Sequence, residues 1–306
     1  MPLALRVVFF VAFLLLSGLT VVYLYRRLVR DVTQRRWVRL AGALALVGLA
    51  GGAMVARAIF RNGELSQLLS IFLGLWIGLV LYILLSLVAV DLTRLAVGLR
   101  RKDAAVADPA RRAFLARAVA GGSLVSGGAL ASWGVFRAYE PARVQELAVR
   151  LPGLPKPLEG FTIVQLSDLH IGPVLQQKFV DELVARSNGL RPDLVAITGD
   201  LVDGTPAQLG AFVARLQGLR SRHGTWFCSG NHDHYAGWEE WAQTLSGLGI
   251  NVLRNRRVSI GDGGGSFDLL GVEDYGSRLV RTGYDPQLAA AGRDPARASV
   301  LLSHQP

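Results

Sequence analysis

The chain has a single cysteine, Cys228, among its 306 residues. One cysteine excludes an intrachain disulfide, and by itself it leaves the redox compartment open. Cys228 lies in an apolar run that has the composition of a strand. Since free cysteine is among the residue types most often buried, we expect this side chain to lie in a core.

Acidic residues are scarce in the first half of the chain. Residues 1–150 carry 19 Lys and Arg against 7 Asp and Glu, whereas residues 151–306 carry 14 against 16, so the net charge of +10 belongs to the first half. A nucleic-acid-binding domain would be expected to present a basic patch, and the near-neutral second half has no such excess. The sequence therefore predicts no nucleic-acid partner.

Four stretches of the first half lack charged residues and are apolar enough to cross a bilayer as helices. They predict transmembrane helices at about residues 7–25, 40–56, 65–90 and 118–136, of which the second is the shortest. No charged residue lies in the middle of a stretch, and such a residue would be the usual sign of a transporter or a proton relay. Residues 1–137 are therefore expected to be a membrane anchor without chemistry of its own.

The arginines between these stretches predict the orientation of the chain. The loop at 26–39 holds six Arg and the loop at 91–117 holds seven Lys or Arg, whereas the loop between the second and third stretches has only two Arg. Because basic loops are retained in the cytoplasm, everything after Phe136 is expected outside it, at the cell membrane. Arg111-Arg112 resembles a twin-arginine export signal, although two arginines that merely flank a span would look the same.

The second half alternates apolar, β-rich runs with segments of helical spacing. Runs at 161–166, 194–198 and 225–229 are separated by such segments, and this pattern predicts a parallel sheet. The segment 143–150 alternates, with Val144, Glu146 and Ala148 against Gln145, Leu147 and Val149, and this predicts one more strand ahead of them. The glycine-rich stretch 261–265 predicts a hairpin, so the later part of the chain indicates a mixed or second sheet. We expect a globular domain at residues 143–306.

Each of the three runs ends in residues that can bind a metal ion. Asp168 and His170 follow the first run, Asp200 follows the second, and Asn231 follows the third. Any of them taken alone would be typical of a turn or a helix cap. Because the carboxyl ends of the strands in an open α/β sheet face one crevice, we expect the side chains to converge. Oxygen and imidazole ligands favour Mn, Fe or Zn, and an Asp on a central strand can bridge two ions.

Four ordered blocks carry a family resemblance. The sequences SDLHIG (167–172), GDLVDG (199–204), GNHD (230–233) and LLSH (301–304) resemble those of the calcineurin-like metallophosphoesterases, in particular the membrane-anchored or exported bacterial branch. The resemblance covers about residues 144–306. It implies the α/β class, with an N-terminal helical transmembrane region followed by a four-layer α/β/β/α sandwich.

The resemblance also implies a site that holds two divalent metal ions. It assigns five metal ligands, in chain order Asp168, His170, Asp200, Asn231 and His304. Asp200 would bridge the two ions, and a hydroxide between them would attack phosphorus. His232 would be the acid that protonates the leaving oxygen, or would stabilise the transition state, and Asp233 would orient it.

One family block is missing from the sequence. The resemblance predicts a Gly-His-Xaa-His block after the LLSH region, whose two histidines would complete one metal each, but the sequence stops at Pro306 before it. We therefore expect the sequence to be a fragment. The alternative is a protein that has lost the block and binds metal weakly.

Several further polar residues lie near the ends of the runs. Asp203 is expected to be a turn carboxylate or to contact the edge of the site, and Glu273 and Asp274 are candidates to line the crevice. Trp238 and Trp241, spaced by three residues, are expected to pack in a core or a lid.

Together these features predict a membrane-tethered, metal-dependent phosphoesterase that acts outside the cytoplasm. The bond hydrolysed would be a phosphomonoester, a phosphodiester or a pyrophosphate. The resemblance suggests an envelope or lipid-linked phosphate as substrate, such as a compound like UDP-diacylglucosamine. The alternative is a non-enzymatic membrane protein whose phosphoesterase-like domain binds a ligand or a partner.

Overall fold

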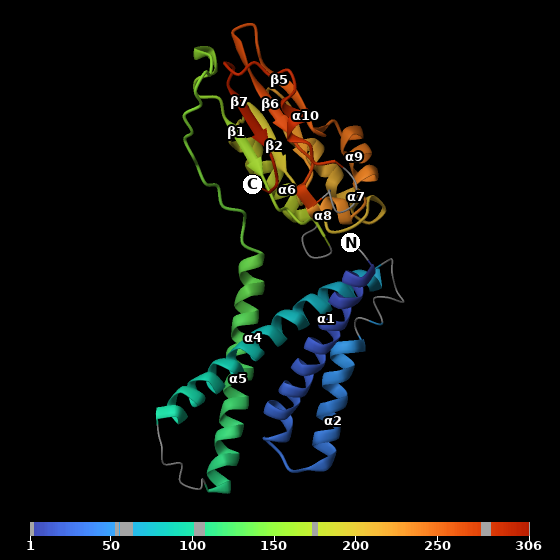
Figure 1. The fold of residues 1–306 in the computed structure, drawn as a ribbon, viewed down its shortest axis with the longest axis vertical. Coiled ribbons are helices and arrows are strands. Elements are labelled where there is room, and N and C mark those ends of the chain that lie inside the picture. Colours follow the sequence, from blue (N-terminus) through green and yellow to red (C-terminus); the bar gives the residue numbers. More distant parts are fainter. Residues whose placement is uncertain are drawn as a thin grey trace. The chain divides into compact units, whose positions relative to one another are not determined.

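The structure is a computed structural model, and it describes residues 3–52, 55, 64–100, 108–172, 177–276 and 283–305. The chain divides into two compact units, Met1–Glu140 and Pro141–Pro306. The first is helical and the second contains all the strands of the described residues (Figure 1).

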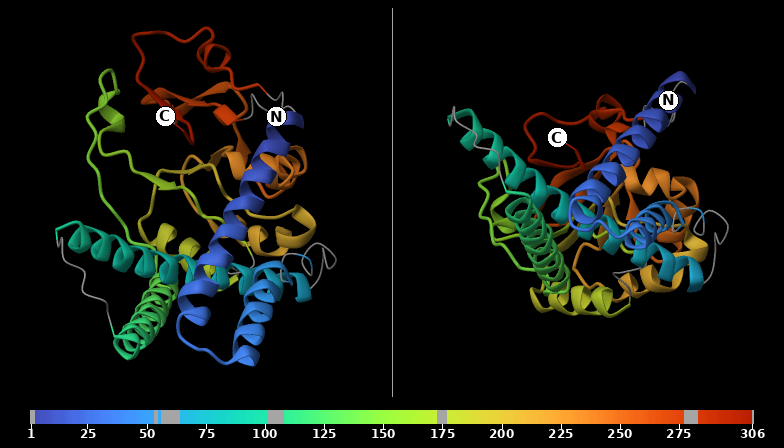
Figure 2. Two further views of the ribbon diagram at one scale, coloured as in Figure 1. Left: turned by 60° about the horizontal axis from the view of Figure 1, so that its bottom comes forward. Right: turned by 90° about the horizontal axis from the view of Figure 1, so that it is seen from below.

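The helical unit is built from long apolar helices (Figures 1 and 2). Its described elements, in chain order, are α1 (Leu3–Leu24), the π-helical η1 (Tyr25–Arg30), α2 (Arg36–Val47), the π-helical η2 (Gly48–Gly52), α4 (Glu64–Arg100) and α5 (Pro109–Ala138).

Within the described residues, three helical stretches are long and apolar enough to cross a membrane. They are Val7–Arg30, Leu68–Val97 and Pro109–Ala138, and they include three of the four predicted spans almost completely. The remaining prediction, 40–56, lies partly outside the described residues. What is described of it, in α2 and η2, is helical. The count of four spans stays a prediction.

A charged group joins the helices of this unit. Asp91 of α4 accepts hydrogen bonds from the Tyr23 hydroxyl (2.7 Å) and from Nη2 of Arg27 (2.5 Å). α4 continues through Asp91, which lies just beyond the predicted span, to Arg100. α4 and α5 cross closely at Gly127, where an added Cβ would lie 2.9 Å from the backbone nitrogen of Ile83.

The second unit begins with a parallel sheet. Its strands lie in the order β1 (Ile163–Leu166), β2 (Leu194–Thr198), β3 (Thr225–Cys228) and β4 (Asn251–Val252). The elements between and after them are α6 (Gln177–Gly189), α7 (Pro206–Val213), the 3₁₀-helix η4 (Ala214–Gly218), α8 (Asn231–Tyr235) and α9 (Trp238–Gly247). All five residues of β2 are buried, as is typical of a parallel strand covered on both faces.

A second sheet packs on the first. β5 (Arg256–Asp262) and β6 (Gly265–Gly271) form the predicted antiparallel hairpin, and β7 (Ser299–Leu302) pairs with β6 in parallel. The short helices η3 (Lys156–Leu158) and α10 (Pro286–Ala290) belong to this part, and α10 packs against β5 and β6.

The side chains of β2 alternate between two cores. Val195 and Ile197 belong to the core shared with α6, α7 and α9, whereas Leu194 and Ala196 pack with residues of the second sheet. The layers are therefore helices, sheet, sheet and helix, and the predicted α/β sandwich behind apolar N-terminal helices is confirmed. Cys228 is fully buried between the sheets, as expected, and burial raises the pKa of its thiol to about 12.

The predicted strand at 143–150 is wrong. These residues adopt no strand, and the side chains of Leu147 and Val149 are exposed. Alternation produces a strand only where a neighbouring strand supplies hydrogen bonds, and no described strand pairs with this segment.

Candidate metal centre

The loops that follow β1 and β2 are joined to each other by backbone hydrogen bonds. The amide of Asp168 donates to the carbonyl of Gly199 (3.2 Å), that of His170 to Asp200 (3.0 Å), and that of Asp203 back to Ile171 (3.0 Å). The parallel pairing thus continues beyond the strands, and it brings the first two polar blocks side by side.

Three of the predicted metal ligands have left-handed backbone conformations. The φ angles are 55° at Asp168, 43° at His170 and 50° at Asp200, and the described residues contain only two other non-glycine residues with positive φ. Such a conformation is costly for a residue with a Cβ and persists only where the surroundings enforce it. The loops therefore hold these side chains in place at the expense of local strain, which is typical of a functional site.

Glycines allow three strand ends to meet. Gly199 has φ 81°, and a Cβ on it would lie 2.6 Å from the backbone nitrogen of Gly230 and 2.8 Å from Cβ of His304. His304 follows β7 of the second sheet, so the contact at Gly199 brings the two sheets together at the site. The glycine before Asp200 and the glycine before Asn231 are thus needed for the close approach.

Asp168, Asp200 and His304, called here the Asp200 group, could hold a metal ion. One ligand atom from each lies within 4.8 Å of the others. Nδ1 of His304 lies 3.0 Å from the carbonyl oxygen of Thr198. Because a carbonyl only accepts, Nδ1 carries a hydrogen, and the other ring nitrogen, Nε2, faces Oδ2 of Asp200, 3.4 Å away.

A carboxylate oxygen and a ring nitrogen that face each other in a buried site can hold a cation between them. The side chains of Asp200 and His304 are only 6% and 9% exposed, so water screens the carboxylate poorly. Carboxylate oxygen with imidazole nitrogen is a donor set suited to Mn, Fe or Zn, and the backbone hydrogen bond to Nδ1 is the usual way in which a ligating histidine is oriented. The residues present fit a divalent metal ion.

His170, Asp203 and His232, called here the Asp203 group, form a second cluster with the same spacing limit of 4.8 Å. Oδ1 of Asp203 lies 3.1 Å from Nδ1 of His170 and 2.6 Å from Nδ1 of His232. The two rings meet edge to face, with their centroids 4.6 Å apart. Burial lowers the pKa of His170, but the nearby carboxylates, Asp203 above all, outweigh it and raise that pKa.

Asp233 does not pair with His232 as predicted. Its Oδ1 accepts from the amide of Leu201 (2.9 Å) and its Oδ2 from the amide of Gly230 (2.8 Å), so both oxygens bind backbone. Burial raises the pKa of this carboxyl to about 6, against the opposing effect of these hydrogen bonds. Asp233 thus ties the turn after β3 to the loop after β2, and the carboxylate that lies within hydrogen-bonding distance of the His232 ring is that of Asp203.

Asn231 begins α8, directly after the third strand. Its Oδ1, the predicted ligand atom, accepts a hydrogen bond from Nε2 of Gln305 (3.1 Å). The neighbouring amide of His232 donates to Oδ1 of Asp200 (2.8 Å), which ties the third polar block to the second. The ligand role of Asn231 stays a prediction.

Asp203 is the site residue that the sequence reasoning undervalued. The available signal was its position three residues after Asp200 in the same block, GDLVDG. Among the other candidates, Glu273 and Asp274 are buried, and Glu273 accepts from Nε1 of Trp238 (3.0 Å). Both Trp238 and Trp241 are buried, which confirms their core role.

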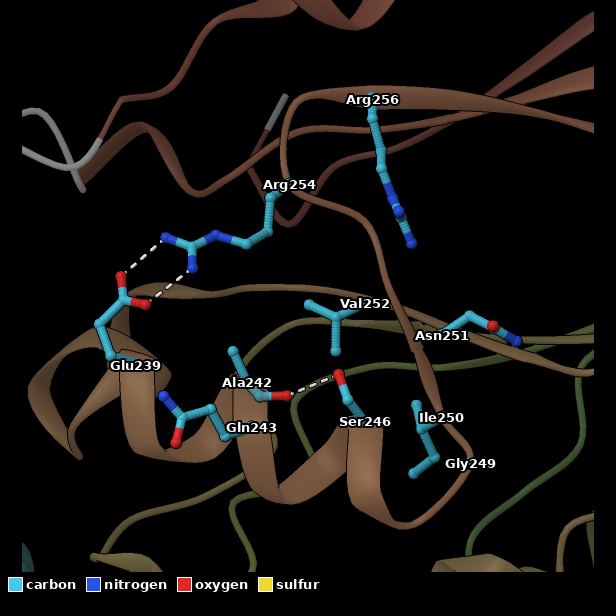
Figure 3. Close-up of a pocket in the computed structure, with 10 residues that line it drawn as sticks. All are labelled: Glu239, Ala242, Gln243, Ser246, Gly249, Ile250, Asn251, Val252, Arg254 and Arg256. Carbon is cyan, nitrogen blue, oxygen red and sulfur yellow. Dashed lines mark hydrogen bonds and ion pairs between the residues drawn. The ribbon is translucent and has the colours of Figure 1, made fainter.

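A cavity of about 660 Å³ lies apart from these residues, beside α9 and β4 (Figure 3). In it, Glu239 and Arg254 form a two-pronged ion pair with N–O distances of 2.7 and 2.8 Å, and Arg256 is a further lining residue. No member of the Asp200 or Asp203 group lines this cavity, so it is not part of the candidate metal centre.

The comparisons with known proteins agree with this geometry. A family model described as calcineurin-like phosphoesterase matches residues 161–306. The chain is 28% identical over 300 residues to a metallophosphoesterase of Campylobacter jejuni, an alignment that covers 96% of this chain and 76% of that protein.

Two further relatives match over the second unit. A transmembrane protein with a metallophosphoesterase domain from Danio rerio is 33% identical over 176 residues, which is 55% of this chain and 40% of that protein. A metallophosphoesterase of Helicobacter pylori is 36% identical over 166 residues, 54% of this chain and 43% of that protein. The chain thus spans about two fifths of the length of these two relatives.

Proposed function

Since the chain belongs to the calcineurin-like phosphoesterases, a family of phosphoesterase hydrolases, through residues 161–306, we propose that it hydrolyses phosphoric ester or diphosphate bonds in a metal-dependent reaction. The observation that carries the proposal is the position of Asp200. Its Oδ2 lies 3.4 Å from Nε2 of His304 and 3.7 Å from Nε2 of His170, so one buried carboxylate oxygen faces a ring nitrogen on either side.

This position suits an Asp shared by two ions. We propose that Asp168 and His170 hold one divalent ion, that Asn231 and His304 hold the other, and that Asp200 contributes to both. When bound, such ions supply Lewis-acid polarisation and neutralise charge on the phosphoryl group. Manganese, iron and zinc all suit the oxygen and nitrogen donors of the site.

His232 is proposed to donate the proton to the leaving oxygen. Oδ1 of Asp203, 2.6 Å from Nδ1 of His232, holds the ring, and the proton would be donated from Nε2. The half-exposed ring lies at the rim of the site, where a substrate oxygen can reach it. Asp233 acts indirectly, because its carboxylate binds backbone amides and so fixes the turn that bears His232.

We further propose that the domain acts beside a membrane, on its extracytoplasmic side. The three apolar helices and the arginine-rich loops at 26–39 and 91–117 support an anchor with that orientation. Arg111-Arg112, in the first turn of α5, suits twin-arginine export. A domain held beside a bilayer suits an envelope or lipid-linked phosphate substrate, such as a compound like UDP-diacylglucosamine.

The test is hydrolysis of bis-p-nitrophenyl phosphate by the protein in detergent, with Mn²⁺ added. We expect metal-dependent release of nitrophenol that Asp200→Asn reduces at least about 100-fold, because a bridging ligand supports several kcal/mol of charge stabilisation. Asp181→Asn, an exposed carboxylate on α6, is the matched control and should turn over like the wild type. If Asp200→Asn keeps the wild-type rate although Mn²⁺ binds, the proposed mechanism is wrong. If Mn²⁺ binds and the wild type releases no nitrophenol, a ligand-binding role replaces the proposed reaction.

A further inference from the structure

We propose that the helical unit carries a binding surface for the phosphate groups of anionic membrane lipids. The surface is formed by six arginines from two segments that are far apart in the sequence, called here the arginine patch: Arg26, Arg35, Arg36, Arg111, Arg112 and Arg117. The inference rests on the proposed membrane attachment but not on the proposed hydrolysis.

A side chain of α5 brings the two segments together. Nε of Arg117 donates a hydrogen bond to the carbonyl oxygen of Val32 (3.2 Å), 85 residues earlier in the chain. The turn that contains Val32 is itself closed by Arg39, whose side chain donates to the carbonyls of Arg30 and Thr33 (both 2.8 Å). The first turns of α5 and the turn between η1 and α2 therefore lie at one end of the helical unit (Figures 1 and 2).

The nearby acidic side chains are engaged elsewhere. Asp31 lies 3.9 Å from Arg27 and 3.7 Å from Arg30, and Asp91 binds Arg27. Asp108 caps α5 by accepting from the amide of Ala110. Within the described part of the chain, no acidic side chain pairs with an arginine of the patch, and all six of these arginines are exposed. The patch therefore presents six guanidinium charges that nothing described neutralises.

Two exposed aromatic residues indicate that the occupant is a lipid. Trp37 follows Arg36 and is 69% exposed, and Phe114 follows Arg112 by two residues and is 68% exposed. Tryptophan in particular is typical of the boundary between headgroups and acyl chains, and clusters of four to eight basic residues next to a span attract anionic headgroups. The planar guanidinium also matches a phosphate with two parallel hydrogen bonds. A soluble polyanion would explain the charges but not the aromatic residues.

The bound lipid would be separate from the proposed substrate. The patch includes the first turns of α5, whereas the phosphoesterase domain follows the other end of that helix. With 30 residues, α5 is about 45 Å long, which exceeds the roughly 30 Å hydrocarbon core of a bilayer. Headgroups held by the patch and phosphates hydrolysed by the domain would thus lie in opposite leaflets.

Quenching of Trp37 by brominated lipids tests the proposal on the full chain in vesicles. Brominated phosphatidylglycerol should quench Trp37 more strongly than brominated phosphatidylcholine with the same chains, and the Trp37→Phe variant isolates this signal from the other five tryptophans. Removing charge in Arg35→Gln/Arg36→Gln should lower the preference for the anionic lipid about fivefold per arginine at low ionic strength.

A matched pair of substitutions controls for net charge. Arg186→Gln/Arg220→Gln removes two exposed arginines of the second unit and should leave the lipid preference unchanged. Equal quenching by the two lipids, or an equal loss in the control pair, would overturn the proposal, as would binding of a soluble DNA duplex without any lipid preference. The patch variants should hydrolyse bis-p-nitrophenyl phosphate in detergent at the wild-type rate, so failure of the patch and failure of the proposed reaction are distinguishable.

Discussion

The bodies of strands β1 to β3 and the loops at their carboxyl ends differ in almost every physical respect. The strands are regular and largely buried, and their side chains fill two apolar cores. The loops carry three non-glycine residues in left-handed conformations, and their side chains are carboxylates, amides and imidazoles. The apolar sheet thus provides the stability that offsets two costs in the loops, the strained backbone conformations and the burial of the Asp200 carboxylate.

The largest loss of activity is expected from a substitution in α8, directly after β3. His232→Ala should lower kcat about 10²- to 10⁴-fold, the usual contribution of a positioned general acid, while the affinity for Mn²⁺ stays unchanged. Steady-state kinetics with bis-p-nitrophenyl phosphate and calorimetric titration of Mn²⁺ measure the two quantities separately. A parallel loss of metal affinity would show that His232 is a ligand, and the Asp203 group would then belong to the metal site.

His304→Ala should have its effect on metal binding first. The substitution removes the imidazole that faces Asp200. Loss of a group that only hydrogen-bonds to a metal ligand lowers metal affinity roughly 10- to 100-fold. Because His304 is proposed as a ligand itself, we expect the Mn²⁺ affinity to fall by more than this. Calorimetry measures the affinity, and circular dichroism checks that the fold is kept. His223→Ala, a histidine outside both groups, is the control. Unchanged Mn²⁺ affinity in His304→Ala would remove the Asp200 group from the proposed centre.

Asp203→Asn and Asp233→Asn separate the observed partner of His232 from the predicted one. Asp203→Asn should reduce kcat about tenfold with little change in KM or stability, because the exposed carboxylate holds the acid ring. Asp233→Asn should instead cost about 1–3 kcal/mol of stability, since an amide cannot accept from both the Leu201 and Gly230 amides.

Kinetics and thermal unfolding of the two variants make the comparison. A catalytic loss in Asp233→Asn with unchanged stability, and a silent Asp203→Asn, would restore the pairing that the sequence suggested.

The strand bodies were predictable from the sequence because burial on both faces requires continuous apolar runs. The run LVAIT at 194–198 predicts a buried strand, and the structure has β2 over those residues. The alternation at 143–150 was misleading, because a strand also needs a partner and the sequence does not name one. α4 extends beyond the predicted span at 65–90, to Arg100, because a charge-free span ends at Asp91 whereas a helix can continue past a charged residue.

The site was predictable in its members but not in its pairings. The position after each strand is enough to place Asp168, Asp200 and Asn231 at one edge of the sheet. Which carboxylate contacts His232 depends on how two loops dock, and Asp203 reaches the ring only because its amide continues the pairing with Ile171. Asp233 is adjacent to His232 in sequence, yet its two oxygens accept from the amide of Leu201 in the neighbouring loop and from the amide of Gly230 in its own turn.

The smallest effect is expected within a strand body. Cys228→Val exchanges one small apolar side chain for another in the core between the sheets, so it should change stability by less than about 1.5 kcal/mol at pH 7 and leave kcat unchanged.

A larger difference in stability between the two proteins should appear only at alkaline pH. Burial raises the folded-state pKa of the thiol to about 12, above its ordinary value, so the wild type loses stability as the pH rises from about 9 toward 12, and the valine variant lacks this contribution. Urea unfolding of both proteins at pH 7 and pH 10.5 measures it, and a catalytic defect in Cys228→Val at pH 7 would show that the strand bodies are not independent of the loops they support.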